Sequence, residues 1–174
     1  LQRQHGFGAK DVRAVRLDVP PLIDHLVGRP PKPEMAINYA RLCARYVTAA
    51  ALTGQGVKFS DFADAAYARA DVQDLAQRVV LTIREDDPNA LDPIGVEIDL
   101  TDGQTLTTRV DAVYGCPANP MTREAQIEKL QMNAETAVVT LPQAQIDTLI
   151  TTIAGLEDVA NARTLVDLTI GEGR

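Results

Sequence analysis

Residues 94–110 read IGVEIDLTDGQTLTTRV, and this stretch decides the fold class. Its first seven residues alternate apolar side chains with polar ones or glycine, which is the two-residue period of a half-buried strand. Asp102-Gly103 follows, a pair that supplies the positive φ of a tight turn, and apolar residues recur at Leu106 and Val110. The stretch therefore predicts a β-hairpin.

Two earlier segments share this period and predict further strands. Residues 12–19 read VRAVRLDV and residues 79–83 read VVLTI. Pro20 and Pro21 lack amide donors and end the first of these strands. The apolar segment 22–27 predicts about one helical turn, and the run Arg29-Pro30-Pro31-Lys32-Pro33 predicts a stiff loop.

The remaining segments predict helices. Residues 35–52 contain no Gly or Pro and carry apolar residues at helical spacing, which predicts one continuous helix. Shorter helices are expected from Ser60, from Asp71 to about Arg78, and after Thr122 as N-cap. Two more are expected at 143–154 and 159–168. The predicted fold is α+β: a small antiparallel sheet packed with helices over residues 1–135, followed by a helical C-terminal segment over residues 136–174.

Composition sets limits on the class of protein. The 174 residues carry 24 acidic and 17 basic side chains, a net charge of −7, and the low pI argues against sequence-independent binding of nucleic acid or of an anionic membrane. Cys43 and Cys116 are not at metal-ligand spacing, which favours a reducing compartment, and we expect the cytoplasm. The chain begins with Leu1 instead of Met, so we expect it to be part of a longer protein.

Common catalytic motifs are absent from the sequence. It has no Gly-x-x-x-x-Gly-Lys loop, no Gly-x-Ser-x-Gly elbow, no Cys-x-x-Cys and no His-Glu-x-x-His. His5 and His25 are expected to be surface or packing residues, and no metal site is expected. The acidic residues between Glu85 and Asp102 are expected to form a solvated edge, because they lack the ligand spacing of a calcium loop.

One segment differs in charge from the rest of the chain. Residues 29–46 contain one acidic side chain, Glu34, and four basic ones: Arg29, Lys32, Arg41 and Arg45. On the predicted helix Arg41 and Arg45 are four residues apart, and like charges at that spacing repel unless a counter-charge is supplied. A carboxylate ligand would supply it. The alternative is two solvated or internally paired arginines, and Tyr39 and Tyr46 are similarly open between core and site roles.

Two motifs carry a resemblance to a known family. Residues 40–52, ARLCARYVTAAAL, resemble the Ala-Lys-Phe-Ser-Leu-Pro-Tyr-x-x-Ala-Ala-Ala-Leu segment of the MmgE/PrpD family, the 2-methylcitrate dehydratase family. Residues 111–124, DAVYGCPANPMTRE, are similar to its Gly-x-Pro-x-Asn-Pro-Met-Thr-Arg-Glu loop. The resemblance covers essentially the whole chain.

The resemblance implies a domain plan and a chemistry. The family combines a large helical domain with a smaller α+β domain, and its C-terminal helices return to the helical domain. Its members add or remove a proton next to a carboxylate without a metal or organic cofactor. This chain would then be the C-terminal domain of a cofactor-independent lyase of the 2-methylcitrate dehydratase type acting on a di- or tricarboxylate. The alternatives are a decarboxylase or epimerase of the cis-aconitate or iminodisuccinate type, or a non-catalytic carboxylate-binding or assembly module.

The resemblance also implies site residues and partners. Tyr46 matches the site tyrosine, a hydroxyl donor or acid; Arg41 stands where the family usually has lysine, and Arg45 where it has proline or glutamine. Asn119 and Arg123 are expected to contact the substrate or the helical domain, or else only to shape their loop. The principal base and acid would lie upstream, so the chain alone would be inactive. The expected partners are a small carboxylate, the chain's own upstream helical domain and a second copy in a homodimer.

Overall fold

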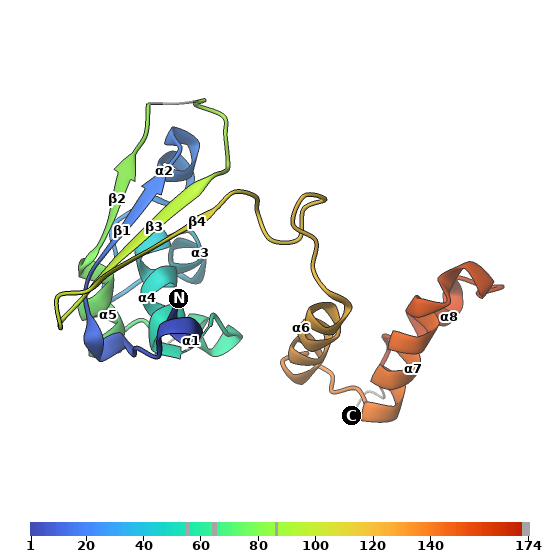
Figure 1. Cartoon of the computed structure of the whole chain (residues 1–174). Coiled ribbons are helices and arrows are strands. Elements are labelled where there is room, and N and C mark those ends of the chain that lie inside the picture. The colour runs from blue at the N-terminus through green and yellow to red at the C-terminus, as the bar shows by residue number, and fades with distance from the viewer. Residues whose placement is uncertain (55, 64–65, 86, 172–174) are drawn as a thin grey trace. The chain divides into compact units, whose positions relative to one another are not determined.

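The computed structural model describes residues 1–54, 56–63, 66–85 and 87–171 (Figure 1). The chain divides into two compact units, Leu1–Asn119 and Pro120–Arg174. The helix that follows Thr122 falls in the second unit, where it packs with the helix at residues 143–154. Within the described residues, no helix combines the length and the apolar character needed to cross a membrane.

The first unit contains a four-stranded sheet in the order β2-β1-β3-β4. The strands are β1 (Val12–Val19), β2 (Val79–Ile83), β3 (Ile94–Leu100) and β4 (Thr105–Val110), and all four match the predicted positions. β3 is antiparallel to β1 and to β4, whereas β1 and β2 are parallel. The sheet is therefore mixed, not wholly antiparallel, because a helical crossover between β1 and β2 brings the chain back in the same direction. The α+β class is confirmed.

The hairpin between β3 and β4 has the predicted turn. Gly103 has a φ of 93°, in the left-handed region that favours glycine. The Asp102 carboxylate accepts a hydrogen bond from the Gln104 backbone N–H at 2.9 Å. Ile98 lies opposite Leu106 across the pair, so the apolar faces of both strands are in register.

Helices cover one face of the sheet (Figure 1). They are α1 (Gln2–His5), α2 (Pro21–Val27), α3 (Ile37–Arg41), α4 (Ala44–Gly54) and α5 (Ala70–Gln77), with 3-10 turns at Ala9–Asp11 and Phe59–Phe62. α4 and α5 pack against each other and against β2. Buried side chains from β1, α4 and α5, among them Val15, Ala49 and Leu75, form the core. In place of the helix expected from Ser60, the described residues form a 3-10 turn at Phe59–Phe62.

The single helix predicted over residues 35–52 is wrong. α3 ends at Arg41 and α4 begins at Ala44, with a break at Leu42 and Cys43. Cys43 forms a β-bridge with Gly28, and its thiol donates a hydrogen bond to the Arg29 carbonyl at 3.2 Å. These contacts hold the chain away from helical geometry at a point where the local apolar pattern alone favours a helix.

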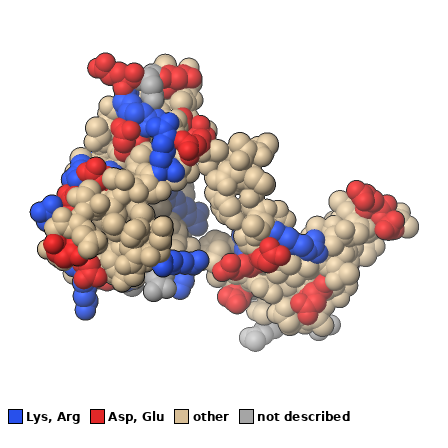
Figure 2. Space-filling view, viewed as in Figure 1, with Lys and Arg blue, Asp and Glu red and all other residues tan. Residues whose placement is uncertain are grey.

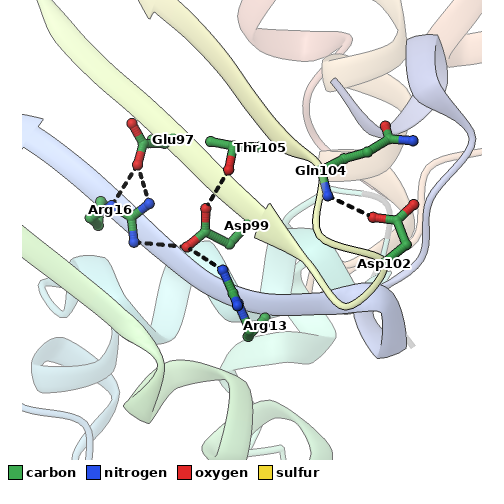
Figure 3. A network of polar contacts seen from close by, with 7 residues as sticks. All are labelled: Arg13, Arg16, Glu97, Asp99, Asp102, Gln104 and Thr105. Atoms are coloured by element: carbon green, nitrogen blue, oxygen red, sulfur yellow. Dashed lines mark hydrogen bonds and ion pairs between the residues drawn. The ribbon is translucent and has the colours of Figure 1, made fainter.

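The opposite face of the sheet carries a network of charged side chains (Figure 3). The Asp99 carboxylate lies 3.0 Å from Arg16 and 3.3 Å from Arg13, and it accepts the Thr105 hydroxyl at 2.8 Å. Arg16 also pairs with Glu97 on the neighbouring strand. Hydrogen bonding from Arg16 and then Thr105 lowers the pKa of Asp99 to about 2. The two arginines of β1 are thus neutralised by acids of β3. We call this set the sheet network.

The second unit consists of α6 (Arg123–Glu135), α7 (Gln143–Ala154) and α8 (Arg163–Asp167), with a 3-10 turn at Leu156–Asp158. Thr122 caps α6 as predicted, its hydroxyl accepting the Ala125 N–H at 3.2 Å. Ile146 and Leu149 are buried, because α7 contacts both α6 and α8. Ile153 is half exposed.

Candidate functional site

The four basic residues of the 29–45 segment share one property. Arg29 and Lys32 lie in the loop after α2, Arg41 ends α3, and Arg45 lies in the first turn of α4. Within the described residues, none of the four forms an ion pair with a carboxylate, whereas several arginines elsewhere do; these are Arg13, Arg16, Arg69, Arg84, Arg109 and Arg163. The internally paired alternative is therefore excluded for carboxylate partners in the described part of the chain.

Aromatic rings hold three of these four cations. The Arg41 guanidinium lies 5.7 Å from the ring centre of Phe62. Arg29 and Lys32 lie 5.2 Å and 5.0 Å from the ring centre of Tyr39. A guanidinium stacked on a ring keeps its in-plane N–H groups available, and these form the fork that matches a carboxylate. The cations are therefore positioned without being neutralised. We call Arg29, Lys32, Arg41 and Arg45 the ring-held cluster, although Arg45 itself has no stacking partner.

Arg45 carries the clearest unmet bonding requirement. The residue is partly exposed, but its Nε is enclosed and has no hydrogen-bond acceptor among the described residues. A buried N–H without an acceptor is costly, and such groups in proteins are nearly always satisfied. The sequence predicted Arg41 and Arg45 on one face of a continuous helix. The structure corrects this prediction, because the helix breaks between the two residues.

Cys43 connects the backbone of the loop that carries Arg29 to the start of α4. Cys43 is fully buried, and burial raises the pKa of its thiol. Backbone hydrogen bonds from Tyr46 and Arg45, and then the positive charges of Arg45 and Arg29, act in the opposite direction on this pKa. Cys43 therefore joins the loop that carries Arg29 to the first turn of α4, where Arg45 lies.

Tyr46 is a core residue in this structure. Its side chain is 1% exposed and packs edge-on against Phe62 and Tyr67. Its hydroxyl donates a hydrogen bond to the backbone carbonyl of Asp61. Burial, followed by the Asp61 charge, raises the pKa of Tyr46 to about 12. The hydroxyl thus faces the protein backbone and not solvent, and a catalytic role for it stays a prediction.

Asn119 and Arg123 belong to different units. The Asn119 side chain donates to the Ala112 carbonyl at 3.0 Å, and its backbone bonds to Gly115 and Cys116, so it fastens its own loop. Arg123 begins α6 and lines a pocket of about 250 Å³ in the second unit. The other residues lining this pocket are Gln126, Ile127, Leu130, Ile150 and Ile153. Within the described residues, no hydrogen bond or ion pair joins Asn119 to Arg41 or Arg45.

The sequence indicates the four cations but not the aromatic rings beside three of them. The cation–ring contacts join separate segments of the chain. Arg41 lies over Phe62, and Arg29 and Lys32 both lie over Tyr39. The one local signal was an aromatic residue a few positions after a loop rich in proline and cations. The described residues hold no group of three or more His, Cys, Asp or Glu side chains placed to bind a metal ion.

Comparison with known proteins places the chain in a family. Residues 1–154 match the model of the MmgE/PrpD C-terminal domain. The cis-aconitate decarboxylase of Mus musculus is 30% identical over 168 residues, covering 95% of this chain and 33% of the relative. The cis-aconitate decarboxylase of Homo sapiens is 30% identical over 134 residues, covering 76% of this chain and 27% of the relative. The chain thus spans about a third of the length of the curated relatives it matches, and it belongs to the MmgE/PrpD family, within the part that the family's C-terminal domain describes.

Proposed function

We propose that this chain is the carboxylate-holding domain of a cofactor-independent lyase that acts on a di- or tricarboxylic acid. The observation that carries the proposal is the ring-held cluster: four neighbouring cations without a carboxylate partner among the described residues, one of them with an enclosed N–H that lacks an acceptor. Family membership supports the same reading.

The chemistry explains why such a cluster is useful. Removing a proton next to a carboxylate places negative charge on that carboxylate, and fixed cations stabilise the charge as it develops. Arg45 and Arg41 would supply these cations. The base and the acid would come from a helical domain upstream of Leu1, which this chain would meet as a partner, and we further propose that the complete protein is a homodimer.

Two reactions remain candidates, and the relatives favour one. In dehydration a base removes the proton next to the carboxylate and hydroxide leaves with a proton from the acid. In decarboxylation a carbon–carbon bond breaks, CO₂ leaves, and the electron pair stays on carbon until the acid protonates it. Because both curated relatives are cis-aconitate decarboxylases, decarboxylation is the second candidate that a specific observation favours. Both reactions need the carboxylates that are not lost to be held still.

The test is a substrate panel on the full-length protein. Citrate, 2-methylcitrate and cis-aconitate are incubated in D₂O, and NMR follows deuterium entry, water loss and CO₂ release. We expect turnover of at least one acid, and a loss of about 10-fold or more in kcat/KM for Arg45→Gln, because it removes a charge-assisted hydrogen bond. Arg109→Gln is the matched control, since Arg109 pairs with Asp111 at the surface.

The outcomes separate an enzyme from a binding module. Binding of the acids without deuterium exchange or product would overturn the lyase and leave a carboxylate-binding module, a reading that the buried hydroxyl of Tyr46 favours. An equal loss of kcat/KM in Arg45→Gln and Arg109→Gln would remove the ring-held cluster from the mechanism.

A further inference from the structure

The loop of residues 29–33 is fastened at three of its carbonyl groups. Three side chains from separate segments donate to them: Cys43 to the Arg29 carbonyl at 3.2 Å, Tyr39 to the Pro30 carbonyl at 2.8 Å, and Gln73 to the Lys32 carbonyl at 2.9 Å. The prolines of the loop also restrict its backbone, because the ring fixes φ. The loop is therefore ordered before any ligand arrives, which reduces the entropic cost of binding.

This fixed loop places two cations on one ring. Arg29 and Lys32 lie 5.2 Å and 5.0 Å from the centre of the Tyr39 ring. The face of a ring attracts a cation, but it does not neutralise the charge. Within the described residues neither cation pairs with a carboxylate, and Arg29 makes one weak side-chain contact, to the Leu26 carbonyl at 3.4 Å. Two like charges held on one ring favour an anion as their common ligand.

The loop also borders Arg45. Gly28, at the start of the loop, forms a β-bridge with Cys43, two residues before Arg45. The Cys43 thiol donates a hydrogen bond to the Arg29 carbonyl at 3.2 Å, so the loop and the start of α4 are in contact. One small acid with more than one carboxylate group can therefore meet cations of the loop and of the helix together.

We propose that Arg29 and Lys32 form a second cationic subsite, seated on Tyr39, that binds another carboxylate group of the acid held by Arg41 and Arg45. The subsite selects acids with several carboxylates over monocarboxylates. Tyr39 is a positioning residue, because it holds the two cations without itself providing charge. This inference rests on the proposed carboxylate-holding function.

The experiment compares two ligands across matched variants of the full-length protein. Isothermal titration measures binding of tricarballylate, which has three carboxylates, and of butyrate, which has one. Arg29→Gln and Lys32→Gln remove the subsite charges; Arg3→Gln and Lys10→Gln remove exposed charges of the same unit elsewhere. We expect each subsite variant to weaken tricarballylate binding about 10-fold and to leave butyrate binding unchanged. The control variants should change neither.

Each other outcome has a defined meaning. If the subsite variants weaken the binding of both ligands equally, the two cations act only through their long-range electrostatic attraction for anions. The inference is then wrong. If neither ligand weakens, Arg29 and Lys32 do not touch the acid, and the inference is again wrong while the proposed function survives. If the unmodified protein binds neither ligand, the proposed function itself fails.

Variants of Tyr39 test the positioning role separately. Tyr39→Phe keeps the ring and loses only the bond to Pro30, whereas Tyr39→Leu removes the seat of both cations. We expect Tyr39→Leu to lower the preference for tricarballylate over butyrate as Arg29→Gln does, and Tyr39→Phe to retain most of it. Circular dichroism confirms that both variants are folded. Equal effects of the two substitutions would contradict a role for the ring.

Discussion

Two sets of basic side chains in the first unit differ in whether a carboxylate of the fold neutralises them. In the sheet network, Arg13 and Arg16 of β1 face Asp99 and Glu97 of β3, and their charges are balanced within the fold (Figure 3). In the ring-held cluster, three of the four cations lie over aromatic rings, and none of the four meets a carboxylate among the described residues. Acidic and basic side chains are interspersed over the face seen in Figure 2, so acids are available on this surface in general.

The difference indicates which arginines stabilise the fold and which are available to a ligand. A paired guanidinium gives its donors to a carboxylate and lowers that carboxylate's pKa, as Arg16 does for Asp99. A ring-held guanidinium keeps its donors, so its charge can be balanced from outside. Substitutions in the two sets should therefore affect different properties of the protein.

The largest expected effect is on ligand binding. Replacing both Arg41 and Arg45 by Gln removes two charge-assisted contacts, and we expect tricarballylate affinity to fall about 100-fold with little change in melting temperature. Arg16→Gln should do the reverse, lowering the melting temperature and leaving affinity unchanged. Titration calorimetry and thermal melts check the pair. If Arg16→Gln weakened binding as much, the distinction between the two sets would fail.

The next effect concerns Tyr46, which lies beside Arg45 in sequence but belongs to the core. Tyr46→Phe leaves the Asp61 carbonyl without its donor, and we expect a loss of about 1–3 kcal/mol in the free energy of unfolding, measured by urea denaturation. Tyr39→Phe, at a partly exposed tyrosine, is the control and should lose less.

Tyr46 also predicts a pH dependence. Its pKa rises from the ordinary value near 10 to about 12 in the folded protein, so folding favours the neutral hydroxyl. That contribution is complete below about pH 10 and is lost as the pH rises toward 12. The urea midpoint of the unmodified protein should fall over this range more steeply than that of Tyr46→Phe. Parallel profiles would contradict the burial of this hydroxyl.

A smaller effect is expected in acid, from the sheet network. Folding lowers the pKa of Asp99 from about 4 to about 2, so its contribution is present above about pH 4 and is lost as the pH falls toward 2. Asp99→Asn should flatten this part of the profile of melting temperature against pH. Arg41→Gln should leave the profile as it is, because Arg41 has no carboxylate partner among the described residues.

The smallest effect is expected at an exposed pair. Arg109 and Asp111 are both solvent-exposed and lie 2.6 Å apart, and solvent screens such pairs strongly. Arg109→Gln should change the free energy of unfolding by less than about 1 kcal/mol. A larger loss in the free energy of unfolding, measured by urea denaturation, would show that this exposed ion pair stabilises the fold substantially and would contradict the prediction.

The sequence predicted what local patterns determine. The four strands, the turn at Gly103, the cap at Thr122 and helix α7 follow from periodicity and turn chemistry within short windows. The break at Cys43 did not follow, because its cause is a bridge to Gly28, a residue distant in sequence. The parallel pairing of β1 with β2 is similarly a property of the crossover and not of either strand.

The candidate site was predicted only as a set of charges. The density of cations in residues 29–45 pointed to Arg41 and Arg45, and the structure adds that they lack carboxylate partners in the described part of the chain. Which ring holds each cation, and that the Tyr46 hydroxyl bonds to the Asp61 backbone, depend on tertiary contacts. A single sequence carries no direct record of such contacts.

A crystal structure of the full-length protein with tricarballylate bound tests the role of the ring-held cluster most directly. We predict one carboxylate within about 2.7–3.2 Å of the Arg45 guanidinium, and a second carboxylate at Arg29 or Lys32. A ligand bound elsewhere, with these guanidinium and ammonium groups facing solvent, would contradict it.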